Sequence, residues 1–320
     1  MHGRISIGRL LLGALLILAV AVVVLNWTYG RLPSEPKPSG AFMQVGNLRI
    51  HYLERPGTGS PVVLIHGLPG TANDFDAVTP LLAGHRTIAI DRPGFGYSTG
   101  GYVPFDRQLQ VIDTLLRTLH VSHPILVGHS YGGTIALGFA ERYPSEAQGL
   151  VLVDAAAAGT HPDGFARVQA RAIQFLQWPV VRQIADATFS QLMLTVSANQ
   201  GDSQAFHPQP VASSHKRRVL AINMTHGNLE ALAGERLAAG GVIDRIDRRL
   251  GAITLPTVVI QGDGDELVKP IYGRRLATAL PGSRLVMVSG GHMVPYTHPM
   301  AVVEAVESVL RRRPAARSGA

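Results

Sequence analysis

The chain has 320 residues, a formal net charge of +7 and no cysteine. Hydrophobic residues make up 46% and charged residues 16%, which excludes a wholly disordered chain and a coiled coil. The lack of cysteine excludes a disulfide scaffold, a thiolate nucleophile and a cysteine-based zinc site.

The positive charge is confined to the two ends of the chain. Residues 1–40 carry +3 and residues 311–320 carry +4, so residues 41–310 are net neutral. A neutral body offers no basic groove, and we therefore expect no nucleic-acid partner.

A long uncharged segment lies close to the amino terminus. It runs for 21 residues between Arg9 and Arg31, and its centre, residues 10–25, is almost wholly leucine, isoleucine, valine and alanine. As a helix rising about 1.5 Å per residue it reaches roughly 30 Å, the thickness of the hydrocarbon core of a bilayer. The pattern predicts a transmembrane signal anchor over residues 1–30, with residues 10–30 in contact with the lipid bilayer.

The flanks of this segment indicate its orientation. Trp27 and Tyr29 follow its far end, where aromatic rings favour the level of the lipid headgroups. Positive charges precede it, while those that follow are partly offset by Glu35, which favours a cytoplasmic amino terminus and an extracytoplasmic body. A cleaved secretory signal is the alternative, although the small-x-small pattern at residues 19–21 lies inside the apolar run and that at residues 39–41 lies well beyond it.

Short β-branched runs alternate with helical patterns along the body. After a hairpin over residues 43–54, strands are predicted at residues 61–66, 87–91, 125–127, 150–154, 257–261 and 284–288. Helices are predicted up to residue 82 after the first of these strands, and at residues 107–119, 132–142, 271–280 and 300–311. This alternation predicts an α/β fold, in which a mostly parallel sheet is covered by helices on both faces.

The same pattern predicts the domain organisation. Residues 160–245 contain helical pattern and no convincing strand, so we expect a helical cap inserted between two strands. The core then comprises residues 43–159 and 246–312. Proline-rich residues 31–42 predict an extended linker, and residues 313–320 a disordered tail.

The strand at residues 125–127 leads through a glycine-rich turn into a helix. The turn has the form G-x-S-x-G, with Ser130 between Gly128 and Gly132. A nucleophile on a sharp strand-to-helix turn needs neighbours without side chains, because backbone and helix approach closely there. We therefore predict Ser130 as a nucleophile. His129 beside it is expected to point into the sheet.

A serine hydroxyl needs a base and an orienting carboxylate, which should follow in the order Ser, Asp or Glu, His. His292 follows a glycine pair directly after the last predicted strand, and is the predicted base. Three acids follow the preceding strand within residues 262–268, and Asp154 ends an earlier strand. Either loop can supply the acid.

With these motifs, the chain resembles the α/β-hydrolase superfamily over about residues 44–310. Two further motifs carry the resemblance, the loop at residues 66–70 (HGLPG) and the segment at residues 91–98 (DRPGFGYS). The family loop G-x-x-D-x-x-V selects Asp265 as the acid, with Asp154 as the alternative that some members use.

The resemblance also implies an oxyanion hole made of backbone N–H groups. The N–H of Tyr131, at the helix start, is one expected donor, and the resemblance makes the N–H of Leu68 the other. His66 is expected to brace this loop by hydrogen bonds, with Gly67 as a supporting residue. We expect no cofactor and no catalytic metal.

The expected activity is that of a serine hydrolase of the carboxylesterase or lipase type, acting on an ester or a lipid-like acyl substrate. A carbon–carbon bond hydrolase would keep the same triad. An epoxide hydrolase or dehalogenase would need a carboxylate where Ser130 stands. A non-catalytic binding module that retains the fold is the remaining alternative.

Overall fold

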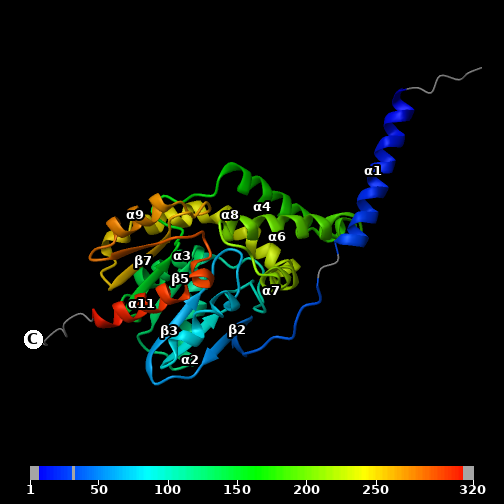
Figure 1. The fold of residues 1–320 in the computed structure, drawn as a ribbon. Helices are drawn as coiled ribbons and strands as arrows, with labels where there is room; N and C mark the ends of the chain where they lie inside the picture. Colours follow the sequence, from blue (N-terminus) through cyan, green and yellow to red (C-terminus); the bar gives the residue numbers. More distant parts are fainter. Residues whose placement is uncertain (1–6, 31–32, 313–320) are drawn as a thin grey trace, which may run out of the picture.

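The computed structural model describes residues 7–30 and 33–312, so the predicted tail and the first two residues of the predicted linker lie outside it. Its centre is an eight-stranded sheet flanked by helices (Figure 1). The strands are β1 (Ala41–Val45), β2 (Leu48–Arg55), β3 (Gly59–Ile65), β4 (His85–Ile90), β5 (Ile125–His129), β6 (Gly149–Val153), β7 (Thr257–Gly262) and β8 (Arg284–Val288). Their order across the sheet is β1-β2-β4-β3-β5-β6-β7-β8.

Strand direction divides the sheet into a short antiparallel end and a long parallel part. β1 and β2 form the predicted hairpin, with Val45 opposite Leu48, and β2 also pairs antiparallel with β4. From β4 to β8 every neighbouring pair is parallel. Parallel strands bury both faces, which explains their unbroken β-branched runs. The predicted α/β fold with a mostly parallel sheet is confirmed.

Helices cover both faces of the sheet. Alternate residues of β3 show the two sides, because Val63 and Ile65 belong to one apolar cluster and Val62 and Leu64 to the other. The first cluster includes residues of α2 (Phe105–Thr118), α3 (Tyr131–Arg142) and α9 (Pro270–Ala279). The second includes residues of α10 (Val294–Thr297) and α11 (Pro299–Arg311).

The helical stretch predicted after β3 is only partly present. It consists of two short 3₁₀ segments, η1 (Ala72–Phe75) and η2 (Thr79–Leu82). Pro80 stands at the start of η2, where it supplies no N–H to continue a helix from η1. The chain therefore turns twice here instead of forming one α-helix.

Five α-helices lie between β6 and β7 and form the cap. They are α4 (Gly164–Leu176), α5 (Pro179–Thr188), α6 (Ser190–Phe206), α7 (Ser213–Arg218) and α8 (His226–Asp247), with a π-helical segment at Val219–Asn223. The cap has its own apolar cluster, which includes Phe95 from the core, Leu229 and Leu232. This cluster joins the cap to the core below it.

Helix α1 (Ile7–Tyr29) extends away from the body from the end of the cap (Figure 1). Its window Leu11–Thr28 has a mean hydropathy of 2.4 and is long and apolar enough to span a membrane. Only its last turns contact the body, where Asn26 is buried. The structure thus holds one apolar amino-terminal helix as a candidate transmembrane segment among its described residues.

Candidate active site

Ser130 occupies a sharp turn between β5 and α3. Its φ of 53° lies in the left-handed region, which a non-glycine residue adopts only under strain. The flanking glycines have a steric reason, because a Cβ on Gly132 would lie 2.1 Å from the carbonyl oxygen of Ile65. A Cβ on Gly128 would lie 2.5 Å from that of Gly132. Backbone packing therefore requires glycine at both positions.

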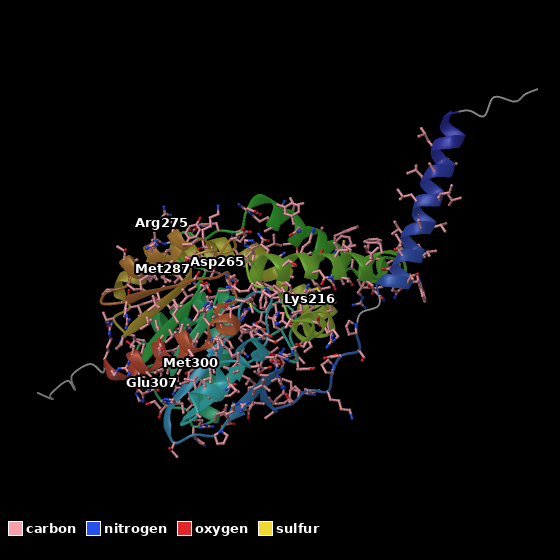
Figure 2. The ribbon with its side chains drawn as sticks, in the orientation of Figure 1. Lys216, Asp265, Arg275, Met287, Met300 and Glu307 are labelled. Atoms are coloured by element: carbon pink, nitrogen blue, oxygen red, sulfur yellow. The ribbon has the colours of Figure 1, made fainter. Side chains whose placement is uncertain are left out.

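His292 and Asp265 are brought together by the loops after β8 and β7. The Nδ1 atom of His292 lies 2.7 Å from Oδ2 of Asp265, and both side chains are buried. The other carboxylate oxygen accepts the backbone N–H groups of Leu267 and Val268. Asp265 is therefore fixed from both sides and orients the histidine, leaving Nε2 to take a proton. Figure 2 marks Asp265 near the middle of the body.

Asp154, the alternative acid, lies at the end of β6 beside this pair. Its Oδ1 accepts the N–H of Gly262 at 2.8 Å and the amide of Gln261 at 3.0 Å. Burial, followed by the charge of Asp265, raises the pKa of Asp154 well above its usual range. This shift favours the protonated form of Asp154, and within the described part of the chain it forms no hydrogen bond with His292.

The predicted oxyanion loop lies against the nucleophile. A Cβ on Gly67 would lie 2.9 Å from Cβ of Ser130, so the start of the loop touches the turn. The His66 ring spans the loop, with Nδ1 2.9 Å from the carbonyl oxygen of Gly67 and Nε2 accepting the N–H of Arg92. Leu68 follows on this loop, and Tyr131 is the first residue of α3.

Arg92 is a buried residue of this site that the sequence did not single out. It donates through Nε to the carbonyl oxygen of His66 and through Nη2 to that of Gly67, at 3.1 and 2.7 Å. Its Nη1 lies 2.6 Å from Oε1 of Glu235 on α8. A fully buried arginine thus ties the predicted oxyanion loop to the cap. Its position in the DRPGFGYS segment was the available signal, whereas Glu235 had none.

His129 does not point into the sheet as expected. Its ring lies beside that of His292, with centroids 4.8 Å apart, and its Nε2 is 2.9 Å from the carbonyl oxygen of His292. Burial, followed by the proximity of His292, lowers the pKa of His129 to about 3. A neutral His129 donates this hydrogen bond and so fixes the backbone of the base.

Three of these side chains also satisfy the distances of a metal site. Ligand atoms of His129, Asp154 and His292 lie within 4.8 Å of one another. His292 already uses Nδ1 for Asp265, so an ion there would take the nitrogen that a proton relay needs. Metal binding and proton transfer at His292 would therefore compete.

The end of α6 covers the base. The carbonyl oxygen of Ala205 accepts the N–H of His292 at 2.8 Å, and a Cβ on Gly291 would lie 2.1 Å from the carbonyl oxygen of His207. His292 is 5% exposed under this contact, and Ser130 is 8% exposed. No sequence signal marks this contact, because it joins two backbone segments far apart in the chain.

A family model, two curated relatives and a solved structure match the chain over most of its length. The sequence model described as "alpha/beta hydrolase fold" matches residues 60–299. "Lipase 3" of Moraxella sp. is 24% identical over 301 residues, covering 91% of this chain and 88% of the relative. The "2-hydroxy-6-oxononadienedioate/2-hydroxy-6-oxononatrienedioate hydrolase" of Paraburkholderia phymatum is 29% identical over 262 residues, covering 78% of this chain and 87% of that protein. The enol-lactonase structure from Burkholderia xenovorans shares the fold, with a TM-score of 0.70 at 21% identity over 85% of this chain and all of the other.

Proposed function

The chain belongs to the α/β-hydrolase family, and from that premise we propose that it is a serine hydrolase that cleaves carboxylic esters. The observation that carries the proposal is Ser130 on its strained turn, in a site where Asp265 contacts His292 at 2.7 Å. A serine with an oriented histidine performs acyl transfer, whereas epoxide and haloalkane chemistry needs a carboxylate nucleophile.

The reaction follows from these groups in two halves. Nε2 of His292 takes the proton of Ser130 as Oγ attacks the ester carbonyl, and the N–H groups of Leu68 and Tyr131 stabilise the oxyanion. The imidazolium gives that proton to the departing alcohol, which leaves an acyl-enzyme. Water attacks the acyl group with the same base, and the products are a carboxylic acid and free Ser130.

The preferred substrate is an apolar or lipid-like ester. The relative named Lipase 3 supports this class, as does the apolar helix α1. The relative named for an oxononadienedioate makes an acidic oxo compound the second candidate substrate. Turnover of p-nitrophenyl esters of graded chain length, beside such an oxo acid, separates the two.

We further propose that α1 is an uncleaved anchor with a cytoplasmic amino terminus and an extracytoplasmic catalytic domain. Support comes from Asn26, which donates to the carbonyl oxygen of Asp186 and accepts the N–H of Leu192. Cleavage after residue 41 would remove Asn26, which is buried against the cap. Carbonate-resistant sedimentation of the intact chain, with protease protection of its amino terminus only, tests the topology.

Fluorophosphonate labelling of the detergent-solubilised full chain tests the chemistry. We expect labelling of the wild type and complete loss in Ser130→Ala. Ser98→Ala, which changes another nearly buried serine, serves as the control and should still be labelled. Absence of labelling in well-folded wild type would refute a serine nucleophile and favour the non-catalytic alternative.

A further inference from the structure

The outer face of the cap carries large apolar side chains in solvent. On α4, Phe165, Val168 and Phe175 are separated by three and seven residues, which places them along one side of the helix. Phe165 and Val180 are each 70% exposed, and Trp178 is 63% exposed. We name this face the outer apolar stripe, and it consists of Phe165, Val168, Phe175, Trp178, Val180 and Ile184.

The stripe is not the core-facing side of these helices. The inner side of α4 already packs into the protein, where Ala170 is fully buried and Ile173 joins the apolar cluster of the cap. Ala185 on α5 is likewise buried. A surface helix normally has a single apolar side. Large apolar side chains that stay exposed beside this packed side indicate a non-aqueous neighbour.

The stripe is continuous with the candidate membrane span. The outer apolar stripe ends on α5, and the last turn of α1 forms hydrogen bonds with that helix. Trp27 donates through Nε1 to the carbonyl oxygen of Ala187, and Asn26 bonds both Asp186 and Leu192. Figure 1 shows α4 along the upper edge of the body, and α1 extending upward from the right-hand end of the body. A bilayer spanned by α1 therefore meets this edge first.

The side chains of the stripe suit the interfacial zone of a membrane. The rings of Phe175 and Trp178 pack together with centroids 5.4 Å apart, and tryptophan favours the headgroup level. Arg167 and Arg171 are exposed on the same helix and can reach lipid phosphates. Exposed arginines beside an apolar stripe are typical of a surface that lies on an anionic bilayer. They are not typical of a surface that packs into a protein core.

We propose that the outer apolar stripe docks into the headgroup boundary of the bilayer that α1 spans, so that the cap lies on the membrane. The inference rests on the anchor proposed above and extends it from one helix to a surface. An ester in the outer leaflet would then meet the cap directly, without first crossing water. Through α6, which begins at α1 and ends over His292, the membrane-bound side of the cap is continuous with the catalytic base.

Trp178 is a built-in probe, because the chain has only two tryptophans. The full-length Trp27→Phe variant, reconstituted in phosphatidylcholine and phosphatidylglycerol vesicles, reports Trp178 alone. With lipids brominated at shallow acyl positions, we expect its emission to fall about twofold or more. The matched control is Met300→Trp in a Trp27→Phe/Trp178→Phe background, since Met300 is 51% exposed and lies away from α4 and α1 (Figure 2). Its emission should stay unquenched.

The other outcomes are distinguishable. If acrylamide quenches Trp178 as strongly as the control and brominated lipid does not, the stripe faces water and the proposal is wrong. If neither quencher acts, a second copy of the chain covers the stripe, which also overturns it. A chain that fails to float with vesicles refutes the anchor and the docking together. Fluorophosphonate labelling of Ser130 is independent of all three results.

A kinetic test uses the same surface. In Phe165→Ser/Val180→Ser, KM for an ester carried in vesicles should rise about tenfold, because two apolar contacts with lipid are lost. The kcat for a water-soluble ester should stay unchanged, and Met300→Ser should alter neither value. An equal loss on both esters would show damage to the fold and contradict docking as the cause.

Discussion

Strands β3, β5, β6 and β7 bury their valine, leucine and isoleucine side chains almost completely, whereas α4 and α5 leave Phe165, Trp178 and Val180 largely exposed. The sheet provides fixed strand ends on which the reacting groups stand. The cap packs on the core through an apolar cluster that includes Phe95 and Leu229, and hydrogen bonds join it to the predicted oxyanion loop, to His292 and to α1. On the proposed function, the core would hold the reacting groups and the cap would govern access and placement.

The largest expected effect concerns the two carboxylates of the core. Asp265→Asn should lower kcat about 1,000-fold or more, because the amide no longer stabilises the imidazolium or selects its tautomer. Asp154→Asn should lower kcat less than about tenfold, because Asn has the shape of the neutral acid that burial maintains there. Steady-state turnover of a p-nitrophenyl ester measures both. A large loss in Asp154→Asn alone would reverse the assignment.

The second-largest expected effect tests the ion pair between Arg92 of the core and Glu235 of the cap. Arg92→Met should destabilise the protein by about 3–5 kcal/mol, because it leaves the Glu235 carboxylate buried without its partner. Thermal unfolding of the solubilised chain measures the loss. The double variant Arg92→Met/Glu235→Leu should lose less than the two single variants together. Simple additivity would show that the pair does not couple core and cap.

Whether a feature is local or joins distant segments decides whether it could be predicted from the sequence. Ser130, Asp265 and His292 stand in loops that directly follow strands, so a local pattern is enough to find them. Contacts such as Arg92 with Glu235 join distant segments and have no local signature. Helix bounds in the cap were equally unpredictable, because Pro179, Pro208, Pro210 and several glycines interrupt the helical pattern there.

The pH dependence of stability compares the two regions through a buried acid, Asp74, and a partly buried acid, Asp202. Burial, followed by the nearby charge of Asp91, raises the pKa of Asp74 in η1 to about 7 from an ordinary 3.8, and burial raises that of Asp202 in the cap to about 6. For each acid, the folded state binds more protons between its two pKa values, so stability falls as pH rises through that window.

Between pH 5 and 7 this predicts a loss of up to about 3 kcal/mol that Asp74→Asn should remove. Asp202→Asn should remove less, since its window closes near pH 6. Unfolding temperatures at pH 5 and pH 8 provide the measurement. If neither variant flattens the pH dependence, these carboxyls are not protonated in the folded protein.

The smallest expected effect lies where α1 joins the cap. Asn26 lies within the protein and is only 2% exposed, and it binds one peptide group at the end of α5 and another in the first turn of α6. Phe189, at the start of α6, has no polar side chain with which to cap the helix. Asn26 therefore supplies from α1 the acceptor that the local sequence lacks.

Asn26→Leu should then lower the stability of the cap by about 1–2 kcal/mol, because two part-buried hydrogen bonds to the backbone are lost. Asn26→Asp keeps an acceptor for Leu192 but no donor for the Asp186 carbonyl, so an intermediate loss is expected. Hydrogen exchange of α5 and α6 in the full chain measures both. Wild-type exchange in Asn26→Leu would mean that α1 only tethers the body. Faster exchange confined to these helices would mean that the anchor helix completes the fold of the cap, because Asn26 donates to the carbonyl oxygen of Asp186 and accepts the N–H of Leu192.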